Sequence, residues 1–313
     1  MSRPSETLSD NDTWVEAAPR LSVLIPFLRD DPSRLLEALD REAADLNGRV
    51  EVVALDDGSD DEALAARVRT VVTGRALPAR FVRLSHNVGR SRGRNRLATH
   101  ARGEWFLFLD SDMLPDAKDF LAAYLRLIEA ERPAVAFGGF SVEQAPRNRV
   151  HALHRRMAQR SDCAPVALRR LAPEKHVFTS NLLVRRDVFE TEAFDEGFAG
   201  WGWEDVEWAM RVAERHRILH VDNTATHLGL DAAVTMAAKY EQSAANFARV
   251  VARHREVVQR YPSYRVARML KRLPLRDAWR PALKAFALAE AAPLGARAFA
   301  MRLYRAALYA EAV

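Results

Sequence analysis

A run of five apolar residues, 105–109, ends directly at two aspartates, Asp110 and Asp112. A short, unbroken apolar run is typical of a strand that is buried on both faces of a sheet. Side chains alternate along an extended chain, so the two carboxylates point the same way and repel each other unless a cation lies near them. Because ligands of open α/β sheets bind at the carboxyl ends of strands, the pattern predicts a divalent-metal site for an anionic ligand such as phosphate. The alternative is that Asp110 and Asp112 only cap the helix that follows Pro115.

The first half of the chain alternates strand-like and helix-like segments. The predicted strands are 21–27, 50–55, 80–84 and 105–109, and the helices between them begin near Pro32, Ala63 and Arg90. This alternation predicts an α/β fold with a mostly parallel central sheet flanked by helices. Polar residues follow each predicted strand, at 29–31, 56–57, 86–87 and 110–112. Since the carboxyl ends of parallel strands meet at one edge, these side chains are expected to share one site.

The second half gives weaker patterns. The expected elements are a helix over 116–131, a strand over 134–142, a helix and loop covering the site over 150–170, a strand over 176–184, a helix over 204–215 and a short strand over 218–221. Met236, Tyr240, Phe247 and Val251 then recur at helical spacing, which predicts a long helix packed on the preceding domain.

Charge is distributed unevenly along the chain. Residues 249–313 contain 14 Lys and Arg and 4 Asp and Glu, whereas the whole chain has a net charge of +5. A basic tail favours an anionic partner, which means a membrane surface, nucleic acid or a polyanionic substrate. Its Ala- and Arg-rich segments predict either amphipathic helices that lie on an anionic membrane or a solvated helical subdomain packed on the body.

The expected location is the cytoplasm, including the inner face of the cell membrane. One cysteine, Cys163, excludes an internal disulfide and suits a reducing compartment. The polar, acidic first 20 residues lack the apolar core of a signal peptide, and no apolar stretch approaches the roughly 20 residues that cross a bilayer.

Several motifs stand in an order that resembles the family-2 nucleotide-sugar glycosyltransferases of the GT-A fold. They are Asp56-Asp57-Gly58-Ser59, Asn87-Val88-Gly89, Gly93-Arg94-Asn95, Asp110-Ser111-Asp112, the segment 181–186, Phe194-Asp195-Glu196 and Trp201-Gly202-Trp203-Glu204-Asp205. The last motif is similar to the acceptor site of galactosyl- and N-acetylgalactosaminyltransferases, including bacterial chondroitin-type polymerases. The resemblance implies a Rossmann-like GT-A domain, placed over 21–230. The polar residues 1–20 are expected to form a flexible arm, and residues 231–313 a helical, basic C-terminal extension.

The resemblance also implies a role for each matched residue. The donor nucleotide would be bound by Pro26, Asp56, Asp57, Arg94, Asp110 and Ser111, with Asp56 in a supporting role beside Asp57. The acceptor would be bound by Trp201, Gly202, Trp203 and Glu204. A divalent cation, Mn²⁺ or Mg²⁺, would be held by Asp110, Asp112 and His227, and Asp205 would be the general base with Glu204 beside it. Many relatives carry Tyr-Asn after the first strand, but this chain has Phe27-Leu28-Arg29, which leaves the nucleotide open.

The chemistry of sugar transfer requires the same residue types. A leaving diphosphate is neutralised by a hard cation on oxygen ligands such as Asp112, and an acceptor hydroxyl loses its proton to a carboxylate such as Asp205. One base that drives one displacement inverts the anomeric carbon. Each motif also has a structural alternative: a simple turn at 56–59, favourable charge at a helix start for Glu204 and Asp205, core tryptophans, and a solvated Arg94.

The leading hypothesis is therefore an inverting, metal-dependent glycosyltransferase that uses a nucleotide sugar, expected to be UDP-linked, and builds cell-envelope polysaccharide on a glycan or lipid-linked acceptor. One alternative is a nucleotidyltransferase acting on sugar phosphates. Such enzymes usually need a Gly-rich loop after the first strand, and residues 26–32 contain no glycine. The other alternative is a non-catalytic protein whose tail binds membrane or, less favoured, nucleic acid.

Overall fold

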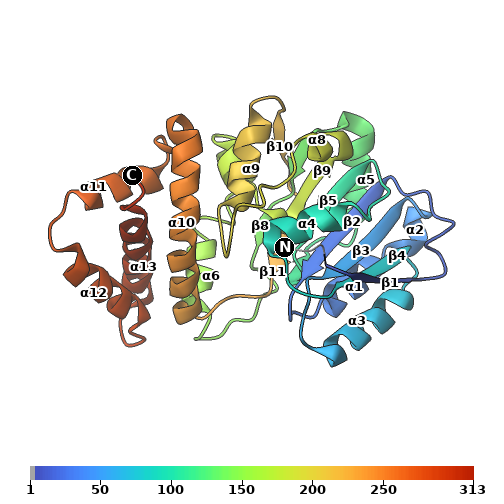
Figure 1. The fold of residues 1–313 in the computed structure, drawn as a ribbon, viewed down its shortest axis with the longest axis horizontal. Helices are drawn as coiled ribbons and strands as arrows, with labels where there is room; N and C mark the ends of the chain where they lie inside the picture. The colour runs from blue at the N-terminus through green and yellow to red at the C-terminus, as the bar shows by residue number, and fades with distance from the viewer. Residues whose placement is uncertain (1–3) are drawn as a thin grey trace.

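The central sheet of the computed structural model, which describes residues 4–313, has eight strands (Figure 1). Their order is β1-β4-β3-β2-β5-β9-β7-β10. The bounds are β1 (Glu6–Asp10), β2 (Leu21–Phe27), β3 (Val50–Asp56), β4 (Ala79–Leu84), β5 (Trp105–Phe108), β7 (Val135–Phe137), β9 (Leu182–Arg185) and β10 (Ile218–His220). β2, β3, β4 and β5 are parallel neighbours, whereas β1 and β9 run antiparallel to theirs. The predicted α/β fold is confirmed.

Helices cover both faces of this sheet. One face packs against α1 (Ser33–Asp40), α2 (Ala43–Leu46), α3 (Glu62–Thr73) and α5 (Phe120–Glu131), and the other against α4 (Arg90–Ala98), α8 (Arg186–Thr191) and α9 (Glu204–Ala213). Along β2, Val23 and Ile25 belong to the first core cluster and Leu24 to the second. Strands buried on both faces explain why these segments are continuously apolar.

A small second sheet places a histidine beside the acidic motif. Its order is β6 (Met113–Pro115), β11 (Ala225–His227), β8 (Phe140–Ser141). β11 pairs antiparallel with β6 so that His227 stands opposite Met113. Because Met113 follows Asp112 directly, this register brings His227 to the end of the Asp110-Ser111-Asp112 motif.

Three predicted elements differ from the structure. The expected strand over 134–142 is broken into β7 and β8 at Gly138-Gly139, where Gly139 has φ +113°. The expected strand over 176–184 is two 3₁₀ turns, Pro173–His176 and Thr179–Asn181, before β9. A buried Asn181 explains both, because its side-chain amide donates to the carbonyls of Gly139 and Asn223, each at 2.9 Å. The helix expected over 116–131 begins only at Phe120, so Asp110 and Asp112 do not cap it.

The predicted flexible arm over 1–20 is wrong for its described part. β1 extends the sheet by pairing with β4 from Glu6 opposite Leu84 to Asp10 opposite Arg80. Trp14 is buried in the second core cluster, with the guanidinium of Arg102 over its ring at 3.9 Å. The segment is polar because β1 is an edge strand, whose stability comes from backbone pairing rather than from apolar side chains.

Replacing Trp14 with alanine is expected to lower the free energy of unfolding by about 3–5 kcal/mol, because a large buried ring leaves a cavity. Urea denaturation of the full chain measures the change. Val15→Ala is the matched control, since the neighbouring side chain is 80% exposed and contributes little. Equal losses in both variants would contradict the packing of this segment.

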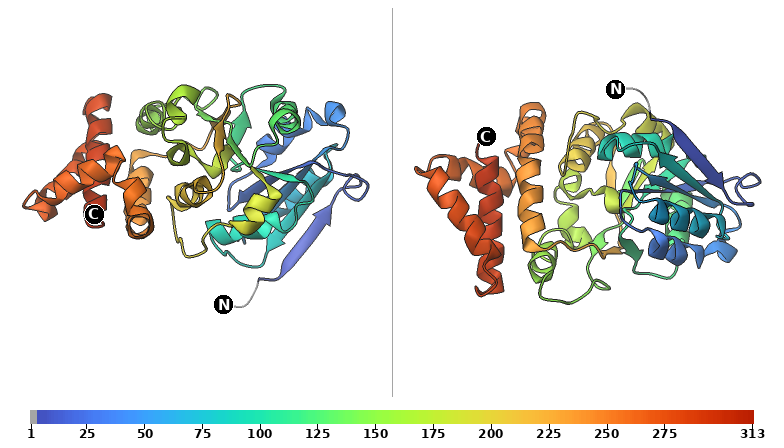
Figure 2. Two further views of the ribbon diagram at one scale, coloured as in Figure 1. Left: turned by 90° about the horizontal axis from the view of Figure 1, so that it is seen from above. Right: turned by 60° about the horizontal axis from the view of Figure 1, so that its bottom comes forward.

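The C-terminal third of the chain is helical. It consists of α10 (Ala233–Val258), α11 (Pro262–Lys271), α12 (Arg276–Leu288) and α13 (Leu294–Tyr309). Figures 1 and 2 show α10 standing between the sheet-containing part and the other three helices. The predicted apolar stripe of α10 is buried. The predicted domain boundary between residues 230 and 231 stays a proposal. None of the helices within residues 4–313 has the length and hydropathy required to cross a membrane.

Candidate active site

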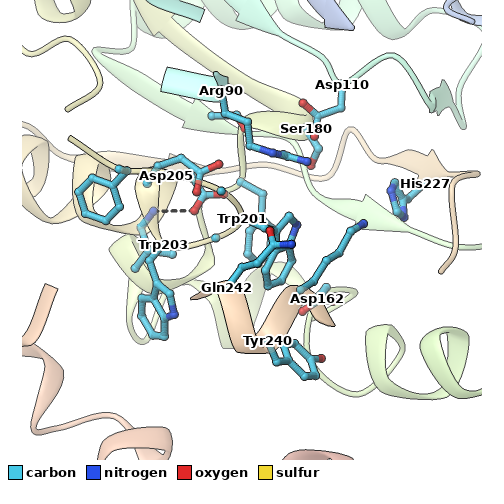
Figure 3. A pocket seen from close by; sticks show the side chains of 18 of the residues that line it. Arg90, Asp110, Asp162, Ser180, Trp201, Trp203, Asp205, His227, Tyr240 and Gln242 are labelled. Carbon is cyan, nitrogen blue, oxygen red and sulfur yellow. Dashed lines mark hydrogen bonds between the residues drawn. The ribbon is translucent and has the colours of Figure 1, made fainter. Parts of the chain in front are cut away.

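A cavity of about 2430 Å³ lies at the carboxyl edge of the sheet and collects the predicted site residues (Figure 3). Its lining includes Pro26, Asp57, Arg94, Asp110, Ser111, Asp112, Trp201, Gly202, Trp203, Glu204, Asp205 and His227. Asp56 is fully buried, and its Oδ1 accepts a hydrogen bond from the Ser59 amide at 2.8 Å, which suits the supporting role predicted for it. Residues from six separate parts of the chain therefore share one cleft.

At the predicted donor end, Asp57 joins the ends of β3 and β4. Its Oδ1 accepts from the Val88 amide at 2.9 Å, and its Oδ2 accepts from the Gly89 amide at 3.1 Å and from Asn87 Nδ2 at 3.0 Å. Burial raises the pKa of this carboxyl to about 6, although the backbone hydrogen bonds oppose the shift. Asp57 thus fixes the turn 87–89, and nucleotide contact by Asp57 stays a prediction.

Gly58 is expected to tolerate no side chain. Its φ is +74°, and a Cβ there would overlap the backbone of His86 and Asn87. Gly58→Ala is therefore expected to cost about 2–4 kcal/mol of stability and to weaken binding of nucleoside diphosphates. Gly48→Ala is the control, because Gly48 has φ +69° but nothing within 4 Å of the added Cβ, so it adds only backbone strain of about 1 kcal/mol. Urea denaturation and calorimetric nucleotide binding compare the two, and equal losses would refute the overlap.

Arg94, on α4, connects Asp110, which follows β5, to the start of α9. Its side chain is buried, which rules out the solvated alternative. Nη2 donates to Asp110 Oδ1 at 2.7 Å, and Nη1 lies 3.7 Å from Glu204 Oε1. Since Asp110 faces Arg94, the guanidinium couples the position of the acidic strand end to that of α9.

The predicted metal ligands are only partly assembled. Asp112 Oδ2 and His227 Nε2 lie 3.0 Å apart, while Asp110 pairs with Arg94 instead of joining them. Within residues 4–313, no group of three or more His, Cys, Asp or Glu is arranged to hold a metal. Arg94 therefore holds the Asp110 carboxylate, while Asp112 and His227 are in contact, and metal binding by the three residues stays a prediction.

The pair nevertheless fits a hard cation that takes its other ligands from a diphosphate. Burial opposes ionisation of Asp112, yet the hydrogen bond and charge of His227 lower the Asp112 pKa, so the carboxylate is charged. Nδ1 of His227 is buried without a hydrogen-bond partner in the described part of the chain. A Cβ at Gly229 would overlap Asp112 Oδ2, so the absence of a side chain there keeps room for this carboxylate.

The acidic pair Glu204 and Asp205 begins α9 and faces the cavity. Figure 3 shows Asp205 on one side of the cavity, with Asp110 and His227 on others. Burial, and next the charge of Glu204, raises the pKa of Asp205 to about 7, against the stabilising hydrogen bond from the Val206 amide. A carboxylate with a pKa near neutrality is a suitable proton acceptor.

The loop before α9 has an unusual backbone. Gly200, Gly202 and Trp203 have φ of +72°, +91° and +77°, and the left-handed region is uncommon for tryptophan. The Trp203 ring packs on Phe247 with centroids 4.8 Å apart, and its Nε1 donates to Tyr309 Oη at 2.9 Å. Trp203 is thus held by the C-terminal helices, as the core alternative expects, although it lines the cavity and its acceptor role stays a prediction.

Asn246 is a contributor that the sequence analysis missed. Its Nδ2 donates to the carbonyls of Ala199 at 3.0 Å and Gly202 at 2.9 Å, which holds the loop before α9 on α10. The available signal was a polar residue beside Phe247 on the recognised apolar stripe. Buried polar residues in such stripes usually satisfy a specific backbone group.

Comparisons with known proteins agree with this geometry. Residues 22–192 match the family described as glycosyl transferase family 2. The uncharacterized glycosyltransferase YfnE of Bacillus subtilis (strain 168) is 31% identical over 121 residues, which span 39% of this chain and 30% of that protein.

Solved structures share the fold at low identity. The mannosyltransferase PcManGT from Pyrobaculum calidifontis, in complex with GDP-Man and Mn²⁺, has a TM-score of 0.60 and 18% identity over 97% of this chain and 89% of that chain. TarS 1–349 from S. aureus, in complex with UDP-GlcNAc, has a TM-score of 0.53 and 17% identity over 91% of this chain and 89% of that chain. The family match covers more than half of the sequence and the fold is that of GT-A enzymes, so this chain belongs to glycosyl transferase family 2.

Proposed function

We propose that the protein transfers a sugar from a nucleoside diphosphate, UDP in our assignment, to a hydroxyl of a glycan or lipid-linked acceptor, with inversion. The observation that carries this proposal is the single cavity that joins Asp57, the pair of Asp112 and His227, and Asp205. The structural neighbours that carry GDP-Man with Mn²⁺ and UDP-GlcNAc support a nucleotide-sugar donor and a divalent cation.

Each group in the cavity has a distinct task in this proposal. Asp112 and His227 would hold Mn²⁺ or Mg²⁺, which would supply positive charge beside the leaving diphosphate. Asp205 takes the proton of the acceptor hydroxyl, and Arg94 orients Asp110 and Glu204 around the reacting groups. Trp201 and the backbone of Gly202 would position the acceptor sugar.

Purified protein incubated with a panel of UDP- and GDP-sugars, with and without Mn²⁺, tests the proposal. Release of the nucleoside diphosphate, together with labelled sugar on an added acceptor, is the expected result. Pyrophosphate release from a nucleoside triphosphate and a sugar phosphate would instead show a nucleotidyltransferase. Salt-sensitive binding of nucleic acid without turnover of any donor would favour the non-catalytic alternative.

We also propose that the C-terminal helices contact an anionic membrane, where polysaccharide of the cell envelope is built. Met269 and Leu275 are 68% and 78% exposed, and exposed arginines, including Arg265 and Arg268, lie on the same segment. Exposed apolar residues among cations are typical of surface-bound helices. Flotation of the full chain with vesicles containing phosphatidylglycerol, but not with neutral vesicles, is expected. The absence of flotation with both kinds of vesicle would remove the membrane proposal.

A further inference from the structure

The cavity continues well past the predicted donor and acceptor residues. Its volume of about 2430 Å³ exceeds the roughly 300–1,000 Å³ typical of a small-ligand site. On α13, Phe299, Arg302, Leu303 and Ala306 recur at helical spacing and line this further part. We call it the distal compartment, and its other lining residues include Arg160, Asp162, Leu168, Leu171, Lys175, Tyr240 and Arg305.

The distal compartment begins beside the loop before α9. The ring of Trp201 contacts that of Tyr240, with centroids 6.0 Å apart. The guanidinium of Arg305 lies over the Tyr240 ring, 5.1 Å from the ring centroid. Figure 3 shows Trp201 and Tyr240 on the same side of the cavity, with Asp162 close to Tyr240. A molecule whose hydroxyl reaches Asp205 can therefore extend along Trp201 toward Arg305.

Four cations gather in the distal compartment without forming an ion pair in the described part of the chain. Arg160, Lys175, Arg302 and Arg305 all line it, and none of them forms an ion pair with the residues that the structure describes. Like charges act on one another there: burial, and next the charge of Arg305, lowers the pKa of both Arg302 and Lys175. The cations come from two segments besides α13, the turn after α6 (Ala152–Ala158) and the 3₁₀ turn Pro173–His176, although cations so placed repel each other.

Other charged groups in this region do not neutralise the cluster. Asp162 is the acid that faces it, and its Oδ1 accepts from Ser161 Oγ at 2.8 Å. Glu174 accepts a hydrogen bond from Tyr261 at 2.7 Å, and Lys239 is paired with Asp231 at 2.7 Å. Burial lowers the pKa of His176 to about 4, so this imidazole is neutral near pH 7. Positive charge therefore remains in excess.

We propose that the distal compartment binds a phosphoryl or pyrophosphoryl group carried by the acceptor. This inference rests on the proposed function, because the group is held while an acceptor hydroxyl reaches Asp205. Arginine forks match phosphate oxygens in pairs, and Arg302 and Arg305 stand one turn apart on α13. Four cations facing one acid suit a diphosphate better than a carboxylate, whose single charge leaves most of the excess unopposed.

The acceptor phosphate has two sources, a soluble glycan or a lipid-linked sugar. Leu171 and Phe299 line the compartment and are 81% and 63% exposed, which offers an apolar exit path for a lipid chain. A soluble phosphate would use the cations alone. The same experiment separates the two sources by the length of the chain on the phosphate.

Equilibrium binding of farnesyl diphosphate and of inorganic pyrophosphate to the full chain tests the proposal. Both are measured in the presence of a chelator, so that a metal-dependent donor site does not contribute. The double variant Arg302→Gln, Arg305→Gln is expected to bind farnesyl diphosphate about ten- to a hundredfold more weakly than the wild type, because charge-assisted hydrogen bonds are lost. Arg69→Gln is the matched control, since Arg69 is exposed on α3, outside both the cavity and the C-terminal helices.

Each outcome decides the inference. Tight binding of farnesyl diphosphate but not of pyrophosphate assigns a lipid-linked source, and equal binding of both assigns a soluble one. Unchanged affinity in the double variant, or an equal loss in Arg69→Gln, overturns the proposal. If the double variant has a lowered melting temperature, Arg160→Gln replaces it with the same expected direction. Failure of the proposed function is seen separately, as absence of nucleoside diphosphate release by the wild type.

Discussion

Replacing Asp205 with asparagine is expected to lower kcat for sugar transfer by about 10²–10⁴-fold, the usual contribution of a general base. The amide keeps the shape and the hydrogen bond from the Val206 amide but accepts no proton. Affinity for the nucleoside diphosphate is expected to stay unchanged, because Asp205 lies on α9 and the predicted donor groups lie at the strand ends. Steady-state kinetics and calorimetric nucleotide binding measure both quantities.

The pH dependence gives this prediction a second readout. Burial and the charge of Glu204 raise the pKa of Asp205 to about 7, so the fraction of unprotonated base grows as pH rises through 7. Wild-type kcat is expected to rise over that range, and this rise of kcat with pH is expected to be absent in Asp205→Asn.

Whereas kcat is expected to rise with pH, the contribution of Asp205 to the free energy of unfolding is expected to fall. A carboxyl whose pKa is raised by folding binds its proton more tightly in the folded state, so its contribution to stability falls between pH 4 and pH 7. Asp205→Asn carries no such ionisation, and its melting temperature at pH 8 is expected to exceed that of the wild type.

Glu214→Gln is the control for this experiment. It removes a carboxylate from the exposed end of the same helix, outside the cavity. An Asp205→Asn protein with near-normal kcat, or a Glu214→Gln protein with an equal loss, would contradict the assignment of Asp205.

Much of the α/β core was predictable, because strands buried on both faces leave a local signature. The continuous apolar runs of β2, β3 and β5 report burial directly, and the acids that follow them mark the carboxyl edge. β1 gave no such signature, since an edge strand can be polar and still pair through its backbone. The break between β7 and β8 was also hidden, because it depends on Asn181, far along the chain.

The sequence predicted which residues make up the site, but not which of them contact one another. The sequence placed Asp110 among metal ligands, yet the buried guanidinium of Arg94 takes its carboxylate at 2.7 Å. Arg94 in turn approaches Glu204, which lies more than 100 positions away in the sequence. Such contacts depend on how α4 and α9 pack on the same face of the sheet, and no local pattern encodes that distance. The contact of Asn246 with the loop before α9 was missed for the same reason.

Asp112→Asn is expected to lower kcat by about three orders of magnitude, because neutralisation of a leaving diphosphate by a cation is worth several kcal/mol. Asparagine still accepts a hydrogen bond from His227 Nε2, so the local fold is preserved. It offers a cation one neutral oxygen, whereas the Asp112 carboxylate offers two oxygens that share a negative charge.

Nucleotide affinity with and without metal, measured in both the wild type and the variant, shows whether lost metal binding causes the loss of kcat. Nucleoside diphosphate affinity is measured for the wild type and for Asp112→Asn, each with Mn²⁺ and with a chelator. The wild type is expected to lose affinity on chelation, and the variant is expected to bind weakly in both conditions. Asp119→Asn, which removes an exposed carboxylate paired only with Arg126 among the described residues, serves as the control. If Asp112→Asn gained as much affinity from Mn²⁺ as the wild type does, the cation would be held elsewhere. The pair of Asp112 and His227 would then be a structural ion pair in which burial is offset by mutual charge.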